Sequence, residues 1–343
     1  METLWFCLVA LMITAYVVLD GFDLGAGIVH LGVARSESER RMVIRSIGPV
    51  WDGNEVWLLA AGGTLYFAFP RLYASSFSGF YLPLMIVLWL LILRGIAIEF
   101  RSHLDSPVWK PFWDATFTLA SGLLAVFFGV ALGNVIRGVP LDAAGYYFLP
   151  LWTHLGVRGD VGILDWYTVL VGVLAFLTLA LHGAGWVALK TEGEVQARAR
   201  RVAAVAWPGV VVLTVLVTVA TMRVQPQVWR NLTEHWWGFV FPAVAVAGLV
   251  GARPAGSDKR AFLCSCAFIA GMLASAAFGV YPYVLPSNTD PALGLTVYNA
   301  ATSAYGLKVG LAWWIPGMIL VTGYFAFVYR HFAGKVRMEE EGY

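Results

Sequence analysis

Long apolar runs separated by short polar segments are the dominant pattern of this 343-residue chain. A helix needs about 20 mostly apolar residues to cross the hydrocarbon core of a bilayer. Nine stretches fit this length, although the seventh is short. The pattern therefore predicts an all-α polytopic membrane protein with nine transmembrane helices, at Leu4–Leu31, Gly48–Phe69, Phe77–Phe100, Phe112–Ile136, Gly162–Leu189, Val202–Met222, Trp236–Ala252, Ala261–Tyr283 and Tyr305–Phe332.

Composition supports a chain that lies in the lipid bilayer throughout. Hydrophobic residues make up 59% of the sequence and charged residues 13%, against about 25% charged in soluble domains. A net charge of +2 is too small to indicate nucleic acid binding. The first 30 residues lack the basic start and small-residue cleavage site of a signal peptide, so we interpret them as the first span. We expect a single membrane domain over residues 1–343.

The basic residues predict the orientation of the chain in the membrane. Of 23 Lys and Arg residues, 16 fall on one side of the nine spans, 5 fall on the other, and Arg94 and Lys308 lie inside spans. Because Lys and Arg are enriched in cytoplasmic loops, the N-terminus is predicted outside and the C-terminus in the cytoplasm.

Two acidic pairs interrupt the first two predicted spans. Asp20 and Asp23 lie in the first span, and Asp52 and Glu55 lie in the second. Each pair is spaced i, i+3, so both of its carboxylates share one helix face. A charged Asp at the centre of a lipid-embedded helix costs about 2.5–3.5 kcal/mol on insertion scales. Such acids persist when they are paired, protonated or hydrated, and they usually serve ion or proton movement.

All four acids are expected in the cytoplasmic third of the membrane. At about 1.5 Å per residue, Asp20 lies roughly 24 Å from the outer face. The second span runs the opposite way, which puts Asp52 and Glu55 within about 10 Å of its inner end. Arg94, near the inner end of the third span, is expected to form a structural ion pair with Asp23. Because acids outnumber cations here, we predict a proton path through Asp20, Asp23, Asp52 and Glu55.

Other interpretations stay open on these residues alone. Asp52 could simply mark the water interface, and Arg94 could join helices without any role in proton movement. Buried acids on packed helices would also suit a proton- or cation-coupled secondary transporter.

Motifs for a cofactor or metal are missing from the sequence. His182 is the one histidine well inside a predicted span, whereas a membrane haem usually needs two facing ligands. We expect His182 to be a hydrogen-bonded core residue, and we expect this chain to bind no metal and no cofactor of its own.

Three sequence blocks resemble subunit II of the cytochrome bd-type quinol oxidases, and the similarity extends over nearly the whole chain. The blocks are Leu19-Asp20-Gly21-Phe22-Asp23-Leu24-Gly25-Ala26-Gly27, Gly48-Pro49-Val50-Trp51-Asp52-Gly53-Asn54-Glu55-Val56-Trp57 and Leu93-Arg94-Gly95-Ile96-Ala97-Ile98-Glu99-Phe100-Arg101.

The resemblance implies a fold of two four-helix bundles plus a peripheral helix. Matched to this chain, the first bundle is residues 1–136, the second is 162–284, and the peripheral last helix is 305–332. A weak internal repeat agrees with two bundles, because the first and fifth spans both end in glycine-rich stretches followed by Glu- and Arg-rich loops.

The resemblance also implies a function in a bacterial or archaeal cytoplasmic membrane. Such an oxidase oxidises quinol and reduces dioxygen to water, with two b haems and one d haem in subunit I and none in subunit II. A small single-span accessory subunit often joins the complex, and some relatives hold a structural quinone in subunit II. Asp20, Asp23 and Asp52 match acidic positions of a proton path from the cytoplasm, and Arg94 matches a basic residue that contacts the first helix.

Overall fold

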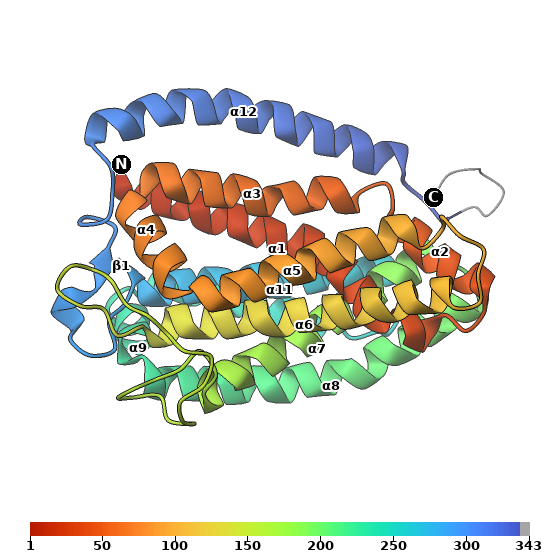
Figure 1. Ribbon diagram of the computed structural model, residues 1–343, viewed down its shortest axis with the longest axis horizontal. Helices are drawn as coiled ribbons and strands as arrows, with labels where there is room; N and C mark the ends of the chain where they lie inside the picture. The colour runs from red at the N-terminus through yellow and green to blue at the C-terminus, as the bar shows by residue number, and fades with distance from the viewer. Residues whose placement is uncertain (337–343) are drawn as a thin grey trace.

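The computed structural model describes residues 1–336, and helices account for nearly all of its regular structure. One small antiparallel sheet pairs β1 with β2. Most helices run along the longest axis of the molecule (Figure 1). In chain order the elements are α1 (Glu2–Val33), α2 (Glu37–Ile47), α3 (Trp51–Ala68), α4 (Pro70–Gly79), α5 (Tyr81–Phe100), α6 (Trp109–Arg137), α7 (Trp166–Lys190), α8 (Gly193–Val224), α9 (Pro226–Glu234), η1 (Trp236–Phe239), α10 (Val240–Gly251), α11 (Asp258–Val280), β1 (Tyr283–Leu285), η2 (Pro291–Leu293), β2 (Leu295–Thr296) and α12 (Ala304–His331).

Seven of these helices are long and apolar enough to cross a membrane, which confirms a multi-pass helical protein. They are α1, α5, α6, α7, α8, α11 and α12. The other two predicted spans correspond to α3 and to η1 followed by α10. Helix α3 has 18 residues, but its first five include the polar residues Asp52, Asn54 and Glu55, while α10 has only 12 residues. Arg337, counted above among the inner basic residues, lies outside the described part of the chain.

The molecule has two ends that differ in structure. One end, called the α2 end below, contains α2 and the C-terminal end of α12. The other, called the β1 end, contains α4, α9 and the small sheet (Figure 1). At the β1 end, Arg137 binds the end of the long segment between α6 and α7. Its guanidinium contacts Asp165 and donates to Asn134 Oδ1 at 2.7 Å and to the Gly162 carbonyl at 3.1 Å.

Helix α1 is the centre of the packing. It contacts α3 and α6 on the N-terminal side of the chain and α7 and α11 on the C-terminal side. The crossing of α1 with α7 has no room for side chains, because a Cβ on Gly25 would overlap the Leu179 carbonyl and one on Gly183 would overlap Gly25. This close backbone approach fixes the depth at which the acids of α1 face the other helices.

The N-termini of several helices carry the capping residues that commonly begin a helix. Ser36 and Glu39 form a reciprocal capping box at α2, and Asp165 and Thr168 form another at α7. Pro70 occupies the first turn of α4, where a missing backbone N–H costs little.

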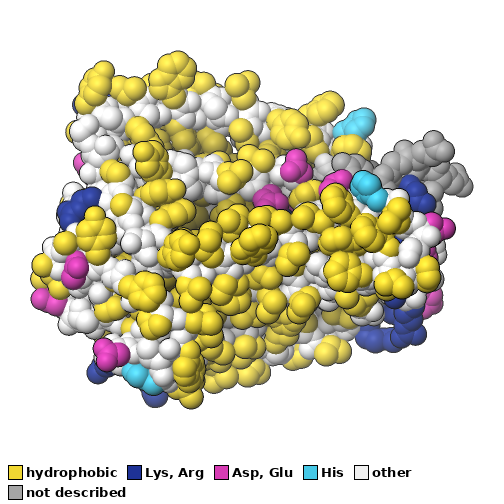
Figure 2. All heavy atoms as spheres, viewed as in Figure 1, with side chains coloured by type: hydrophobic (Ala, Val, Ile, Leu, Met, Phe, Trp, Pro, Cys, Tyr) yellow, Lys and Arg dark blue, Asp and Glu magenta, His cyan; other side chains and the backbone are white. Residues whose placement is uncertain are grey.

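Helix α12 stands apart from the rest of the molecule. Its packing is mainly against α3, and Leu307 is its one buried residue among those described. Figure 2 shows a hollow between α12 and the helices below it, with several acidic side chains at the hollow and hydrophobic side chains over most of the remaining face. Large apolar side chains on α12 are strongly exposed, including Trp313 at 78% and Leu320 at 74%.

Candidate functional site: buried carboxylates around Arg94

Arg94 is the centre of the buried charges. Its side chain is fully buried, and Nη1 donates to both oxygens of Asp20 at 2.7 and 2.9 Å. Nη2 donates to Glu55 Oε2 at 2.9 Å, and Glu55 is partly exposed, at 24%. One guanidinium therefore joins carboxylates from α1 and α3 to α5. Its planar fork suits this double role, since a single ammonium could not hold two carboxylates in the same way.

Asp23 lies beside this ion pair but bonds differently. Asn54 Nδ2 donates to Asp23 Oδ2 at 2.7 Å and also to the Leu19 carbonyl at 3.3 Å. The Tyr329 hydroxyl donates to Asn54 Oδ1 at 2.8 Å, which connects α12 to the group. Asp23 Oδ1 is buried and has no hydrogen-bond partner among the described residues. Together, Asp20, Asp23, Asn54, Glu55 and Arg94 are called the Arg94 cluster.

The structure brings the sequence-predicted residues together with one change of partner. The ion pair expected between Arg94 and Asp23 is not the one present in the described chain, since Arg94 binds Asp20 and Glu55. The reason is helix phase: Asp20 faces α5 while Asp23 faces α3. Asp52 is exposed at the start of α3, three residues before Glu55, whose carboxylate its negative charge repels.

Charge balance within the Arg94 cluster is negative. Asp20, Asp23 and Glu55 provide three carboxylates. Among residues 1–336, Arg94 is the one cation that forms an ion pair with this group, and it binds Asp20 and Glu55. A buried carboxylate without a cation must hold a proton or bind water. The arrangement can therefore accept and release protons inside the helix bundle.

Sequence reasoning missed two members of this network. Asn54 was detectable, because it is a further polar residue between Asp52 and Glu55 in an otherwise apolar span. Tyr329 gave no signal, since an isolated Tyr near the end of a span usually marks the membrane interface. Only the packing of α12 over α3 brings its hydroxyl to Asn54.

A second buried polar group lies at the α2 end. Asp114 accepts hydrogen bonds from His30 Nε2 at 2.7 Å, from Arg101 Nε at 2.6 Å and from Arg40 Nη1 at 3.2 Å. Arg101 also donates to both oxygens of Glu37 at 3.0 and 2.8 Å. These five residues are called the Asp114 cluster. Sequence reasoning missed it, although an Asp inside an apolar span was a signal.

The two buried histidines in the predicted spans, His30 and His182, form hydrogen bonds to other residues and not to each other. His182 Nδ1 lies 2.7 Å from Ser265 Oγ, and Nε2 lies 2.9 Å from the Val18 carbonyl, as expected for a hydrogen-bonded core residue. His30 is engaged by Asp114. Among residues 1–336, no group of three or more His, Cys, Asp or Glu is arranged to hold a metal ion.

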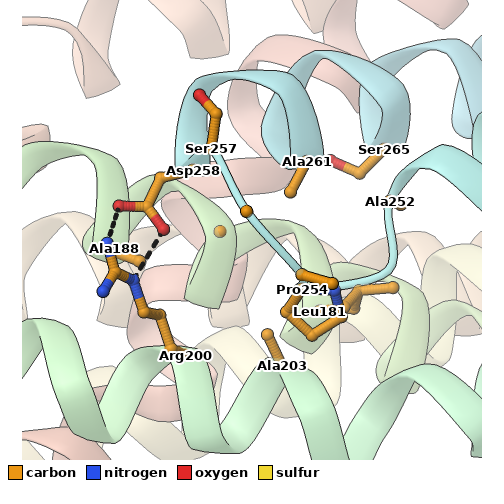
Figure 3. A pocket seen from close by; sticks show the side chains of 13 residues that line it. Leu181, Ala188, Arg200, Ala203, Ala252, Pro254, Ser257, Asp258, Ala261 and Ser265 are labelled. Carbon is orange, nitrogen blue, oxygen red and sulfur yellow. Dashed lines mark hydrogen bonds and ion pairs between the residues drawn. The ribbon is translucent and has the colours of Figure 1, made fainter.

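A separate pocket of about 220 Å³ opens between α7, α8 and the turn from α10 to α11. Figure 3 shows Arg200 and Asp258 bridged across one side of it, with both hydrogen bonds at 2.8 Å. Small side chains, including Ala203 and Ala261, form much of the remaining wall. None of its lining residues belongs to either charged cluster, so the buried acids do not open into this pocket.

Fold and site together define a class: a multi-pass helical membrane protein with ion-paired and unpaired carboxylates buried among its first helices. The sequence profile of "Cytochrome bd terminal oxidase subunit II" matches residues 1–332. The chain belongs to this family, which confirms the resemblance seen in the sequence.

Named relatives agree over nearly their full length. The chain is 32% identical to "Probable cytochrome oxidase subunit 2" of Haemophilus influenzae, covering 97% of this chain and 94% of that protein. It is 30% identical to "Cytochrome bd-I ubiquinol oxidase subunit 2" of Escherichia coli K12, with coverages of 98% and 95%. It is 33% identical to "Cytochrome bd ubiquinol oxidase subunit 2" of Bacillus subtilis, with coverages of 90% and 89%.

A solved structure has the same fold. A chain of the bd oxidase from Geobacillus thermodenitrificans superposes with a TM-score of 0.71 at 21% identity, covering 96% of this chain and 98% of that one. At this identity the likeness concerns the fold alone.

Proposed function

We propose that this chain is the haem-free subunit II of a terminal oxidase that oxidises quinol and reduces dioxygen to water. Family membership and the names of the relatives support the reaction and favour it over a secondary transporter. Haems b and d would lie in subunit I, against which this chain packs. In this proposal His30 and His182 are core residues, because His30 Nε2 bonds to Asp114 and both nitrogens of His182 bond to neighbouring helices.

The Arg94 cluster is the observation that carries a role in proton uptake. Oxygen reduction consumes protons, and a membrane oxidase must deliver them to a buried reaction centre. In the proposed path, exposed Asp52 receives a proton and Glu55 passes it inward. Arg94 holds Asp20 and Glu55 in place as an ion pair, while Asp23, which has no cation, holds the proton before it moves towards subunit I.

The orientation follows from the basic residues. We place the α2 end in the cytoplasm, with the N-terminus outside and the C-terminus inside, because Lys and Arg concentrate there. In this placement α3 and the pair η1–α10 also cross the membrane, which gives nine spans. Buried polar groups of α3 are tolerated because they face other helices rather than lipid.

The proposed partner surface includes α12 and the hollow beside it. If residues 1–136 and 162–284 form the two bundles, α12 is a peripheral helix. Its exposed apolar side chains must then contact lipid or another protein. A small single-span accessory subunit and a structural quinone are further components that we expect from the family.

Two isosteric substitutions test the proton role in the assembled oxidase. Asp23→Asn keeps a partner for Asn54 and breaks no ion pair, and Asp52→Asn alters an exposed side chain. Each should slow oxygen consumption with excess quinol about tenfold or more, equivalent to about 1.4 kcal/mol in the barrier. Asp160→Asn, an exposed change in the segment before α7, is the control and should leave the rate unchanged.

Haem content separates assembly from turnover in this experiment. The reduced-haem spectrum per complex should be the same in all three variants. Normal oxygen consumption and proton uptake in both Asp23→Asn and Asp52→Asn would exclude the proposed path. Ion transport by the isolated chain, without any haem protein, would instead support the transporter.

A further inference from the structure

The pocket between α7, α8 and the turn from α10 to α11 lies at the α2 end of the molecule. Its α7 wall extends from Leu181 to Ala188, seven residues or about 10 Å along the helix. Two residues before Ala188, Trp186 Nε1 donates to the Ser46 carbonyl of α2 at 3.0 Å, which holds this wall against the α2 end. In the proposed orientation the pocket therefore opens at the cytoplasmic face of the membrane.

Below its mouth the pocket has apolar walls. Small residues from α7, α8, the end of α10 and α11 form them, namely Gly185, Ala203, Ala252 and Ala261. Ser265, seven residues into α11, already bonds to His182 and to the Phe262 carbonyl. An apolar cavity of about 150 Å³ is large enough to bind benzene, and this pocket has about 220 Å³. Its inner part therefore suits an apolar ligand such as part of a lipid chain.

The mouth of the pocket is polar and carries a neutral ion pair. Arg200 Nε and Nη2 donate to the two oxygens of Asp258, both at 2.8 Å (Figure 3). Gln196 Nε2 also donates to Asp258, at 3.0 Å. Because Arg200 and Asp258 cancel each other's charge, this pair by itself does not select an anion.

Three further basic residues beside the mouth give it a surplus of positive charge. Arg253 lies in the turn from α10 to α11, and Lys259 and Arg260 lie in the first turn of α11. All three are exposed. Asp258 already binds Arg200, and none of the three basic residues forms an ion pair within residues 1–336. A negatively charged ligand would therefore meet cations that have no carboxylate partner in the described chain.

An aromatic contact holds Arg253 beside the pocket. Its guanidinium lies over the ring of Trp207, 6.0 Å from the centroid. Trp207 is one turn beyond the lining residue Ala203 on α8, and Trp is typical of the depth at which lipid headgroups lie. Val205 on α8 and Leu263 on α11 are exposed, so they offer an apolar surface to the rest of a lipid chain.

We propose that this pocket binds one anionic phospholipid of the cytoplasmic leaflet. The phosphate lies at the mouth beside Arg253, Lys259 and Arg260, and the glycerol and the first carbons of one acyl chain fill the apolar part. Basic pockets between transmembrane helices on the cytoplasmic side are known to bind anionic lipid headgroups. The bound lipid connects α7, α8 and α11. This inference goes beyond the proposed function and does not depend on the proton path.

A matched pair of substitutions tests occupancy of the pocket in the assembled oxidase. Ala203→Leu extends a larger side chain into the pocket, whereas Ala204→Leu adds the same bulk to the exposed side of α8. Delipidated complexes are mixed with equal amounts of phosphatidylglycerol and phosphatidylethanolamine, and native mass spectrometry measures the lipid retained. Wild type and Ala204→Leu should each retain one phosphatidylglycerol more than Ala203→Leu. The same lipid content in both variants, or loss of phosphatidylethanolamine in place of phosphatidylglycerol, would contradict the proposal.

Arg253→Gln removes charge from the exposed mouth and leaves the pocket open, so it tests the proposal even if Ala203→Leu does not assemble. It should weaken phosphatidylglycerol binding about fivefold, as expected for one basic residue near a membrane surface. Arg230→Gln, an exposed change on α9 at the β1 end, is the control and should bind phosphatidylglycerol as wild type does. Unchanged affinity in Arg253→Gln would overturn the assignment to an anionic lipid.

Melting temperatures distinguish a lipid from a free phosphate. Nanodiscs of phosphatidylglycerol should raise the melting temperature of the purified wild-type complex above its value in phosphatidylcholine, because a ligand of the folded state stabilises that state. Ala203→Leu should lose this rise and Ala204→Leu should keep it. Inorganic phosphate added to phosphatidylcholine nanodiscs should not reproduce the rise. An equal rise with inorganic phosphate would show that the mouth binds a free anion, and the lipid proposal would then be wrong.

Discussion

At the scale of single residues, Arg94 shows how a costly charge becomes tolerable. It is completely buried, yet three ionisable groups of α1 and α3 surround it: Asp20 and Glu55, which it binds, and Tyr16. Burying an unpaired ion is strongly unfavourable, whereas a paired ion with all its hydrogen bonds can be neutral in free energy. Arg94 and Asp20 therefore depend on each other, and neither can be removed alone without a large penalty.

Replacing Arg94 tests this dependence. Arg94→Met would leave Asp20 buried without a cation and should lower the free energy of unfolding by about 3–5 kcal/mol. The expected result is little assembled complex, measured as haem-bearing oxidase recovered from membranes. Arg158→Met, an exposed change in the segment between α6 and α7, is the control. Wild-type recovery of the Arg94 variant would show that the ion pair is dispensable.

The Asp114 cluster predicts a dependence of stability on pH through Glu37, which lies on α2 outside the spans. Two hydrogen bonds from Arg101 hold the pKa of the Glu37 carboxyl below its usual value of 4.5. A carboxyl with a lowered pKa in the folded state stabilises the protein above its unfolded-state pKa. That stabilisation is lost as the pH falls through the lowered value.

Glu37→Gln should therefore lower the melting temperature of the purified complex at pH 7, because the charged partner of Arg101 is gone. The gap to wild type should narrow as the pH falls from about 4.5 and should close below the lowered pKa of Glu37, where the wild-type carboxyl is protonated in the folded protein as well. Thermal melts over this pH range measure it. Glu192→Gln, at the exposed turn between α7 and α8, should show no such gap at either pH.

At the scale of helices, the contact between α1 and α7 decides where the acids lie. The glycines at this crossing leave the two backbones in direct contact, so the position of α1 along α7 is fixed to within a fraction of a turn. A shift of α1 by one residue would rotate Asp20 away from Arg94 by about 100°. Tight packing of small residues is therefore a requirement of the charged site.

Gly25→Ala tests the crossing directly. Its Cβ would overlap backbone atoms of α7, which cannot move without separating the helices, so the amount of assembled complex should fall sharply. Gly32→Ala on the same helix is the matched control, because nothing lies within 4 Å of a Cβ there. Equal yields of the two variants would mean that α1 and α7 do not pack this closely.

At the scale of the whole molecule, the proposed orientation can be measured with single cysteines. In a chain with Cys7, Cys264 and Cys266 replaced by Ala, Ser38→Cys places a thiol on α2 and Ala144→Cys places one beyond α6. A membrane-impermeant maleimide should label Ala144→Cys in right-side-out vesicles and Ser38→Cys only in inside-out vesicles. Labelling with the reverse sidedness would show that the proposed orientation is wrong, and that the proposed direction of the proton path is wrong with it.

Much of this protein was determined by its sequence, because the bilayer imposes simple rules on a chain. Apolar length, the placement of Lys and Arg, and the cost of buried acids are local properties, so they predicted a multi-pass helical protein and marked Asp20, Asp23, Asp52, Glu55 and Arg94. Tertiary structure alone decided which acid pairs with Arg94, since helix phase and crossing depth are set by contacts between distant helices. The same contacts bring Tyr329 to Asn54 and join His30 to Asp114, pairings that no spacing along the chain contains.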